Sequence, residues 1–188
     1  STGMPKGVFA LIQGGDRKVG EALVTDPRIK AVGFTGSLAG GRALFDLCAA
    51  RPEPIPFFGE LGSVNPMFVL PAAAAARADE IGTGWAGSLT MGAGQFCTNP
   101  GIAVVTDGPD ADKLVAAAKA ALEKVGPQTM LTDGIAQAYR EGAERMNRSN
   151  AVQPVLTTES AARNASPNLY ETTTDAFLSE HQLGEEEF

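Results

Sequence analysis

The sequence predicts an α/β fold built around a parallel sheet. Short apolar runs end at glycine or other turn residues, as is typical of buried strands. Segments with helical apolar spacing follow these runs, and strand and helix alternate from the beginning of the chain. Such alternation is the signature of βαβ units, in which helices connect parallel strands. A chain of 188 residues with 44% hydrophobic content can bury one core or two small ones.

The first part of the chain contains two strand–helix pairs. Strands are expected at 8–13 and 29–35, and helices at 17–26 and 38–51. Asp16 and Ser37 stand where the two helices would begin, and their side chains can accept hydrogen bonds from the first helical turn. Pro52 ends the second helix because proline cannot continue it.

The rest of the chain repeats this pattern before it becomes irregular. Extended segments are expected at 54–63, 65–71 and 101–108, and helices at 72–92, 109–126 and 131–149. The helix at 109–126 has the clearest signals, since Pro109 opens it and Leu114 and Leu122 belong to an apolar stripe. Periodicity is weak beyond Asn150, and no element is assigned there. A change of composition near residues 62–65 predicts two domains, 1–61 and 62–188.

Composition argues against several function classes. The net charge is −7 and no run of five or more basic residues exists, so nucleic acid is not expected as a partner. No apolar run is long enough for a bilayer span, so no membrane association is expected. Two cysteines and one histidine provide neither a disulfide framework nor a metal site, which favours the reducing cytoplasm. No signal peptide is visible in the first residues.

The two cysteines stand in very different surroundings. Cys48 has helical spacing from Leu44 and Phe45 and is interpreted as buried packing. Cys97 lies in "MGAGQFCTNPG", where flanking glycines and a proline allow the backbone to bring its sulfur and its amide to a ligand. Cys97 is therefore either a nucleophile or an inert loop thiol, and its own motif does not decide between them.

A nucleophilic cysteine needs a proton acceptor. The single histidine, His181, stands in a polar stretch that is typical of a surface. Glu60 follows the apolar run "PIPFFG", and a carboxylate held in apolar surroundings can act as a base near neutral pH. The alternative is that Glu60 is an ordinary solvated loop charge.

The segment "FTGS", residues 34–37, joins an expected strand to an expected helix. The N–H groups of a helix start and the Ser37 hydroxyl form a suitable site for a phosphate, and Gly36 and Gly41 permit close approach of the backbone. The same pattern is also a common helix cap that binds nothing.

Taken together, these motifs resemble those of the aldehyde dehydrogenase superfamily over nearly the whole chain. "FTGS" with Gly41 is similar to the family's dinucleotide-phosphate turn, "FGELGSVNP" to its glutamate motif and "GQFCTNPG" to its cysteine motif. The terminal "EEEF" is similar to the start of its Glu-x-Phe-Gly-Pro motif. The four motifs occur in the family's order, and Glu60 precedes Cys97 by 37 positions. The resemblance implies a parallel-sheet, three-layer architecture of this family, of which the chain is a partial copy.

The resemblance also implies the roles of individual residues. Cys97 would attack an aldehyde to form a thiohemiacetal, and after hydride transfer Glu60 would activate the water that hydrolyses the thioester. The implied cofactor is NADP or NAD, with residues 1–61 as the end of the dinucleotide-binding domain and 62–188 as an incomplete catalytic domain. The implied cofactor-binding residues are Gly15, Gly36, Ser37, Gly41, Leu61, Glu186 and Phe188.

The stretches "FTGSLAGGRALFDL" and "RPEPIP" are most similar to the branch of the family that oxidises α-ketoglutaric semialdehyde (2,5-dioxopentanoate), often with NADP. This branch implies a small aldehyde that carries a carboxylate as substrate. It also implies a homo-oligomer for the protein at full length. No motif of the chain assigns a contact to the substrate carboxylate.

Members of the superfamily are much longer, so the chain is expected to be a middle piece. The resemblance places an oxyanion-hole asparagine and an adenosine-binding lysine upstream, and the 188 residues alone are expected to be inactive. The alternative reading is a non-catalytic α/β module whose Cys97 is a redox-sensing or inert thiol. Such a module would need neither Glu60 nor the phosphate turn.

Overall fold

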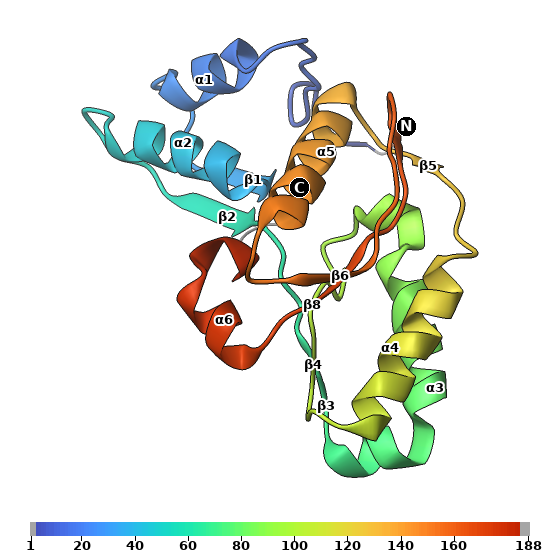
Figure 1. The fold of residues 1–188 in the computed structure, drawn as a ribbon. Helices are drawn as coiled ribbons and strands as arrows, with labels where there is room; N and C mark the ends of the chain where they lie inside the picture. The colour runs from blue at the N-terminus through green and yellow to red at the C-terminus, as the bar shows by residue number, and fades with distance from the viewer. Residues whose placement is uncertain (1–2, 185–188) are drawn as a thin grey trace. The chain divides into compact units, whose positions relative to one another are not determined.

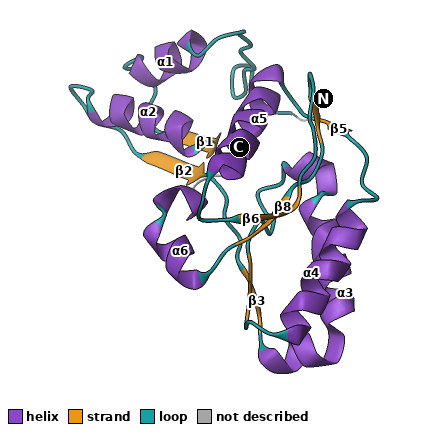
Figure 2. Ribbon diagram, in the orientation of Figure 1, coloured by secondary structure: helices purple, strands orange, loops and turns teal. Residues whose placement is uncertain are grey.

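The computed structural model describes residues 3–184 (Figures 1 and 2). The chain divides into two compact units, Ser1–Gly62 and Ser63–Phe188. Each unit contains one pair of parallel strands with helices beside it, and the second unit also contains two antiparallel pairs. Within the described residues every sheet has two strands. The alternation of strand and helix in the sequence predicts parallel strands, but not which strands lie side by side.

The first unit contains two helices and two strands. In chain order they are α1 (Lys18–Thr25), β1 (Val32–Gly36), α2 (Leu38–Ala49) and β2 (Phe57–Leu61). The side chain of Asp16 accepts a hydrogen bond from Lys18 N–H at 3.0 Å, and that of Ser37 accepts one from Gly40 N–H at 3.2 Å. α2 therefore starts where Ser37 predicted it, whereas α1 starts one residue later than predicted, with Arg17 as its N-cap and no side-chain hydrogen bond at that cap.

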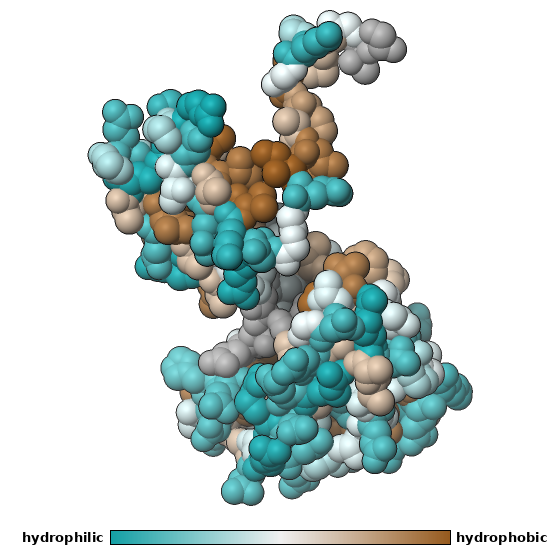
Figure 3. Space-filling view, turned by 90° about the horizontal axis from the view of Figure 1, so that it is seen from above, coloured by the Kyte–Doolittle hydropathy of each residue, from teal (hydrophilic) through white to brown (hydrophobic). Residues whose placement is uncertain are grey.

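The strand expected at 8–13 is absent, and this prediction was wrong. Val8, Phe9, Leu11 and Ile12 are all exposed, and the segment pairs with no strand among residues 3–184. An apolar run becomes a strand only when a neighbouring strand satisfies its backbone hydrogen bonds. Figure 3 shows hydrophobic residues gathered in brown on one face of the molecule, where most of the remaining surface is teal.

The second unit contains most of the regular structure. Its first part comprises β3 (Met67–Val69), α3 (Pro71–Leu89), the short 3-10 helix η1 (Met91–Gly94), β4 (Ala103–Val105) and α4 (Pro109–Leu122). Its second part comprises β5 (Gln128–Thr129), α5 (Asp133–Arg148), β6 (Gln153–Leu156), β7 (Asn164–Ala165), β8 (Leu169–Glu171), α6 (Thr174–Ser179) and η2 (His181–Gly184). The strands after Asn150 were missed because they are two to four residues long, which is too short for a period of two to be recognised.

The core of the second unit lies where α3 and α4 run side by side (Figure 1). Trp85, Ala118, Leu122 and Leu169 form one buried cluster, and Leu114 belongs to a second cluster beside β3 and β4. Pro109 opens α4 at its first turn, and the apolar stripe predicted for this helix is buried. The expected helix at 72–92 ends earlier, at Leu89, because Gly92 and the two residues after it have positive φ and cannot continue a right-handed helix.

A third buried cluster lies beside α5. It contains Met130, Ala136 and Ala165, with Tyr139 packed against it. The Tyr139 hydroxyl donates to Ser166 O at 2.6 Å and accepts from Asn168 Nδ2 at 3.0 Å. Burial raises the pKa of Tyr139 above its ordinary value, which favours the neutral hydroxyl that donates the bond to Ser166 O.

Among residues 3–184, no helix has both the length and the apolar character needed to cross a membrane.

We expect Gly82→Ala to destabilise the contact between α3 and α4. A Cβ on Gly82 would lie 2.3 Å from Leu114 O, and this main-chain atom cannot move away as a flexible side chain could. The expected loss is about 1–3 kcal/mol of unfolding free energy, measured by denaturation of the natural protein. Gly84→Ala on the same helix is the control, since its Cβ would meet nothing within 4 Å, and it is expected to stabilise by about 0.5–1 kcal/mol. Equal stability of the two variants would contradict the proposed close contact.

Candidate active site

Cys97 occupies the apex of a tight turn between η1 and β4. Asn99 N–H donates to Phe96 O at 2.9 Å, which closes a four-residue turn with Cys97 and Thr98 at its centre. Cys97 is exposed, whereas Cys48 is only 1% exposed. The prediction that Cys48 is buried packing is thereby confirmed. Within the described residues, the N–H groups of Cys97 and Thr98 have no hydrogen-bond acceptor, and both therefore remain available to a ligand.

Three successive residues with positive φ lead into this turn. Gly92, Ala93 and Gly94 have φ values of 59°, 59° and 77°. A Cβ on Gly92 would lie 2.5 Å from the Phe96 ring, so glycine is required there by space as well as by conformation. Ala93 tolerates the conformation because its side chain packs against the cluster around Met130.

Two glutamines connect the turn to β5 and the residues after it. Gln128 Oε1 accepts from Ala93 N–H at 2.8 Å, and Gln95 Oε1 accepts from Leu131 N–H at 2.8 Å. Gln95 also donates from Nε2 to Gly92 O at 2.8 Å. The bonds to Ala93 N–H and from Leu131 N–H join two segments that are about 35 positions apart in sequence.

Through its side chain, Asn99 binds the main chain of the segment that precedes the turn. Its side chain is 5% exposed, and Nδ2 donates to Leu89 O at 3.0 Å and to Gly94 O at 2.7 Å. Trp85 Nε1 donates to Pro100 O, which connects the other end of the turn to α3. The turn is thus held to the C-terminal end of α3 by side chains that contact main-chain atoms.

Ser63 and Asn65 hold the main chain of Cys97 itself. Ser63 Oγ donates to Cys97 O at 2.6 Å, and Asn65 Nδ2 lies 2.9 Å from the same oxygen. Asn65 Nδ2 also lies 2.9 Å from Asn99 O and 2.8 Å from Ser63 Oγ. Sequence reasoning missed both residues. The available signal was the presence of two small polar residues inside the glutamate motif "FGELGSVNP" itself, three and five positions after Glu60.

In the first unit, three of the residues predicted to bind a dinucleotide, Gly36, Ser37 and Leu61, lie at the C-terminal ends of β1 and β2. In the register of β1 and β2, Thr35 is opposite Glu60 and Gly36 is opposite Leu61. Gly62 N–H donates to Gly36 O at 3.0 Å, and Ser37 starts α2 at this same end of the strands. The carboxyl ends of parallel strands beside a helix N-terminus are a common place for phosphate groups to bind.

Among the other predicted residues of the first unit, the surroundings of Glu60 differ from expectation. Glu60 is exposed rather than held in apolar surroundings, and within residues 3–184 its strand β2 pairs with β1 alone. Gly41 is buried, and a Cβ there would lie 1.9 Å from Leu61 Cδ2, so this glycine lets Leu61 pack on α2. Gly15 stands in open space, with nothing within 4 Å of a Cβ built on it.

The predicted residues thus form two groups. Gly36, Ser37, Gly41, Glu60 and Leu61 lie together in the first unit, whereas Cys97 belongs to the second. Glu186 and Phe188 lie outside the described residues. His181 is exposed in η2, and no group of three or more His, Cys, Asp or Glu side chains in residues 3–184 is arranged to hold a metal ion.

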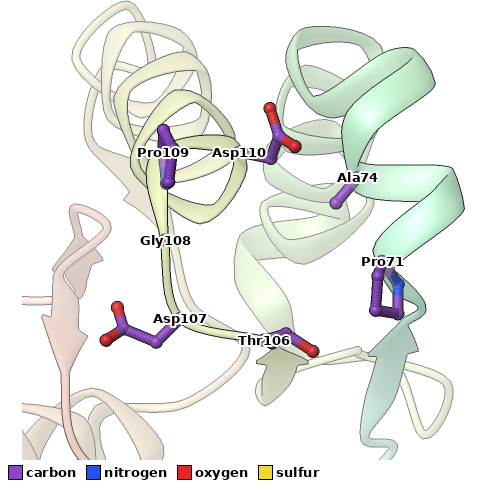
Figure 4. A pocket seen from close by; sticks show the side chains of 7 residues that line it. All are labelled: Pro71, Ala74, Thr106, Asp107, Gly108, Pro109 and Asp110. Carbon is purple, nitrogen blue, oxygen red and sulfur yellow. The ribbon is translucent and has the colours of Figure 1, made fainter.

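A separate hollow of about 110 Å³ lies between the first turns of α3 and α4 (Figure 4). It is lined by Pro71, Ala74, Thr106, Asp107, Gly108, Pro109 and Asp110. Asp110 is paired with Lys113 at 2.9 Å. The hollow contains none of the predicted site residues and is not the candidate active site.

Curated relatives match the chain over its whole length. Alpha-ketoglutaric semialdehyde dehydrogenase 2 of Azospirillum brasilense is 48% identical, and the alignment covers 100% of this chain and 36% of that protein. Alpha-ketoglutaric semialdehyde dehydrogenase of Acinetobacter baylyi is 38% identical over 95% of this chain and 34% of its own length. The chain therefore spans about a third of the length of these relatives.

Solved structures share the fold. A proline utilization A mutant from Bradyrhizobium japonicum aligns with a TM-score of 0.80 at 23% identity, over 96% of this chain and 19% of that one. An NAD-dependent benzaldehyde dehydrogenase from Corynebacterium glutamicum aligns with a TM-score of 0.72 at 22% identity, over 94% of this chain and 39% of that one. These alignments confirm the predicted α/β fold.

The sequence pattern that defines the aldehyde dehydrogenase family matches residues 1–149, which is most of the chain. This match and the identities above confirm the resemblance that the four motifs indicated. The chain belongs to the aldehyde dehydrogenase family.

Proposed function

We propose that the protein containing this chain oxidises an aldehyde to a carboxylic acid with NAD or NADP, and that Cys97 is the nucleophile. The observation that carries the proposal is the exposed Cys97 at the apex of a turn in which the N–H groups of Cys97 and Thr98 have no acceptor within residues 3–184. Membership of the aldehyde dehydrogenase family supports this reading over an inert thiol.

In the proposed reaction, Glu60 takes the proton of the Cys97 thiol and passes it to solvent, and Sγ adds to the aldehyde carbon to form the oxyanion of a thiohemiacetal. The negative charge that develops on the carbonyl oxygen is stabilised by the Cys97 N–H, which needs no rearrangement because no acceptor among residues 3–184 occupies it. The bound dinucleotide supplies the acceptor for the hydride that leaves this carbon. Glu60 then takes a proton from the water that hydrolyses the thioester, which regenerates the thiol.

The first unit supports dinucleotide binding through the edge formed by β1, β2 and the start of α2. Gly36 and Ser37 would hold the pyrophosphate there, since a helix N-terminus carries partial positive charge. Gly41 contributes by letting Leu61 pack closely, and Leu61 would lie near the nicotinamide. Gly15, Glu186 and Phe188 are proposed as further cofactor contacts on the resemblance alone.

The proposed substrate is a short aldehyde that carries a carboxylate, with α-ketoglutaric semialdehyde as the leading candidate. This proposal is supported by two relatives of that name, which are 48% and 38% identical to the chain. We further propose that the full-length protein works in the cytoplasm as a homo-oligomer. The 188 residues alone are expected to be inactive, because they span about a third of the length of the relatives.

The nucleophile is tested by Cys97→Ala in the natural protein. We expect this variant to lose aldehyde oxidation and to retain dinucleotide binding, because the residues proposed to bind the dinucleotide do not include Cys97. Steady-state assays and fluorescence titration with NAD and NADP measure the two properties. Cys48→Ala is the matched control, since its buried thiol should contribute only packing. More than a few per cent of wild-type turnover in Cys97→Ala would reject the assignment.

The base is tested by Glu60→Gln. We expect thioester hydrolysis to slow about 10²–10⁴-fold, because general base catalysis typically contributes that much. Rapid-mix experiments should then show a burst of NADH or NADPH followed by slow turnover. A normal steady-state rate with an unchanged pH profile would identify Glu60 as a surface charge without a catalytic role.

Specificity is tested by comparing aldehydes of similar length with and without a carboxylate. We expect kcat/KM for α-ketoglutaric semialdehyde to exceed that for an uncharged aldehyde by at least about 10-fold, since one ionic hydrogen bond is worth about 1.5–3 kcal/mol. Equal kcat/KM values would leave the family assignment intact and reject the proposed substrate.

A further inference from the structure

Two side chains converge on the Cys97 carbonyl oxygen, and neither belongs to the proposed catalytic or cofactor-binding residues. Ser63 Oγ and Asn65 Nδ2 lie 2.6 Å and 2.9 Å from it. Asn65 Nδ2 reaches Asn99 O as well, at 2.9 Å, so the same amide contacts the main chain on both sides of Thr98. We refer to Ser63 and Asn65 together as the carbonyl clamp.

The carbonyl clamp can restrict the motion of the turn that carries Cys97. Cys97 is exposed, so burial does not hold its side chain in place. An exposed nucleophile must still be held to within a fraction of an ångström, because a displacement of about 1 Å can cost about 100-fold in rate. Two donors on the carbonyl fix the main chain of Cys97 and leave its N–H and its sulfur unobstructed.

The clamp also has a particular place in the sequence. Only Leu61 and Gly62 separate Ser63 from Glu60, the proposed base. The segment that follows Glu60 is therefore hydrogen-bonded directly to the residue that carries the proposed nucleophile.

We propose that Ser63 and Asn65 are positioning residues for Cys97, an inference that rests on the proposed function. They touch no reacting atom. They hold the Cys97 peptide so that Sγ and the N–H face the same carbonyl group, and removing either donor lets the turn move while the fold persists.

The test uses the natural protein with Ser63→Ala, Ser63→Thr and Asn65→Leu. With α-ketoglutaric semialdehyde, we expect kcat to fall about 10-fold in Ser63→Ala and about 100-fold in Asn65→Leu, with KM within about threefold. Ser63→Thr keeps the hydroxyl and should restore kcat to within about threefold of wild type. Ser179→Ala is the control, since its hydroxyl also donates to a main-chain carbonyl, that of Asp175 at 2.8 Å, and this loss should leave kcat unchanged.

A second measurement does not depend on activity. Amide hydrogen exchange of residues 91–101 should accelerate in Asn65→Leu, while exchange in α3 and α4 stays at the wild-type rate. Iodoacetamide should label Cys97 and not Cys48 in every variant, because labelling of the buried Cys48 would report global unfolding.

Unchanged exchange in residues 91–101 would overturn the clamp. Accelerated exchange with normal kcat would overturn its positioning role, as would a Ser63→Thr variant no better than Ser63→Ala. If the wild-type protein oxidises no aldehyde, the proposed function fails, and the exchange measurement still decides whether the clamp holds the turn.

Discussion

The close approach of α3 and α4 at Gly82 is the contact on which the second unit depends. Gly82 lets α3 lie directly against the main chain of Leu114 in α4. One to two turns later, Trp85 and Leu89 of α3 provide partners for Pro100 and Asn99 of the cysteine turn. The position of Cys97 therefore follows from a helix–helix contact that is distant from it in sequence, and tight packing transmits small displacements instead of absorbing them.

In the candidate site, side chains hold the main chain of the cysteine turn in place. Around Cys97, the groups that hold the turn are mostly amide and hydroxyl side chains, and the groups they bind are main-chain carbonyls. Within residues 3–184, this arrangement leaves the N–H groups of Cys97 and Thr98 without an acceptor. At the C-terminal ends of β1 and β2 the direction is reversed, because the Ser37 hydroxyl accepts from the N–H of Gly40 at the start of α2.

The sequence predicted helix starts well, because a helix start depends on residues that are close together in the sequence. Ser37 and Pro109 marked helix starts, and Asp16 lies two residues before one, because capping involves residues that are at most three positions apart. Segment 8–13 was assigned wrongly because a strand requires a partner that composition cannot reveal. Ser63 and Asn65 escaped notice because their bonds to the cysteine turn span 32 to 34 positions. The glutamate motif contains Ser63 and Asn65, but the motif alone does not reveal that these side chains bind the main chain at Cys97.

The two glutamines that connect the cysteine turn to β5 differ in how freely evolution can replace them. In its bond to the turn, Gln128 acts as an acceptor, toward the N–H of Ala93. A glutamate can make the same bond, so position 128 tolerates either residue type. Gln95 accepts from Leu131 N–H and also donates to Gly92 O, and a carboxylate would place two oxygens against each other there. Among family members with this turn, variation between glutamine and glutamate should therefore concentrate at position 128, and position 95 should remain an amide.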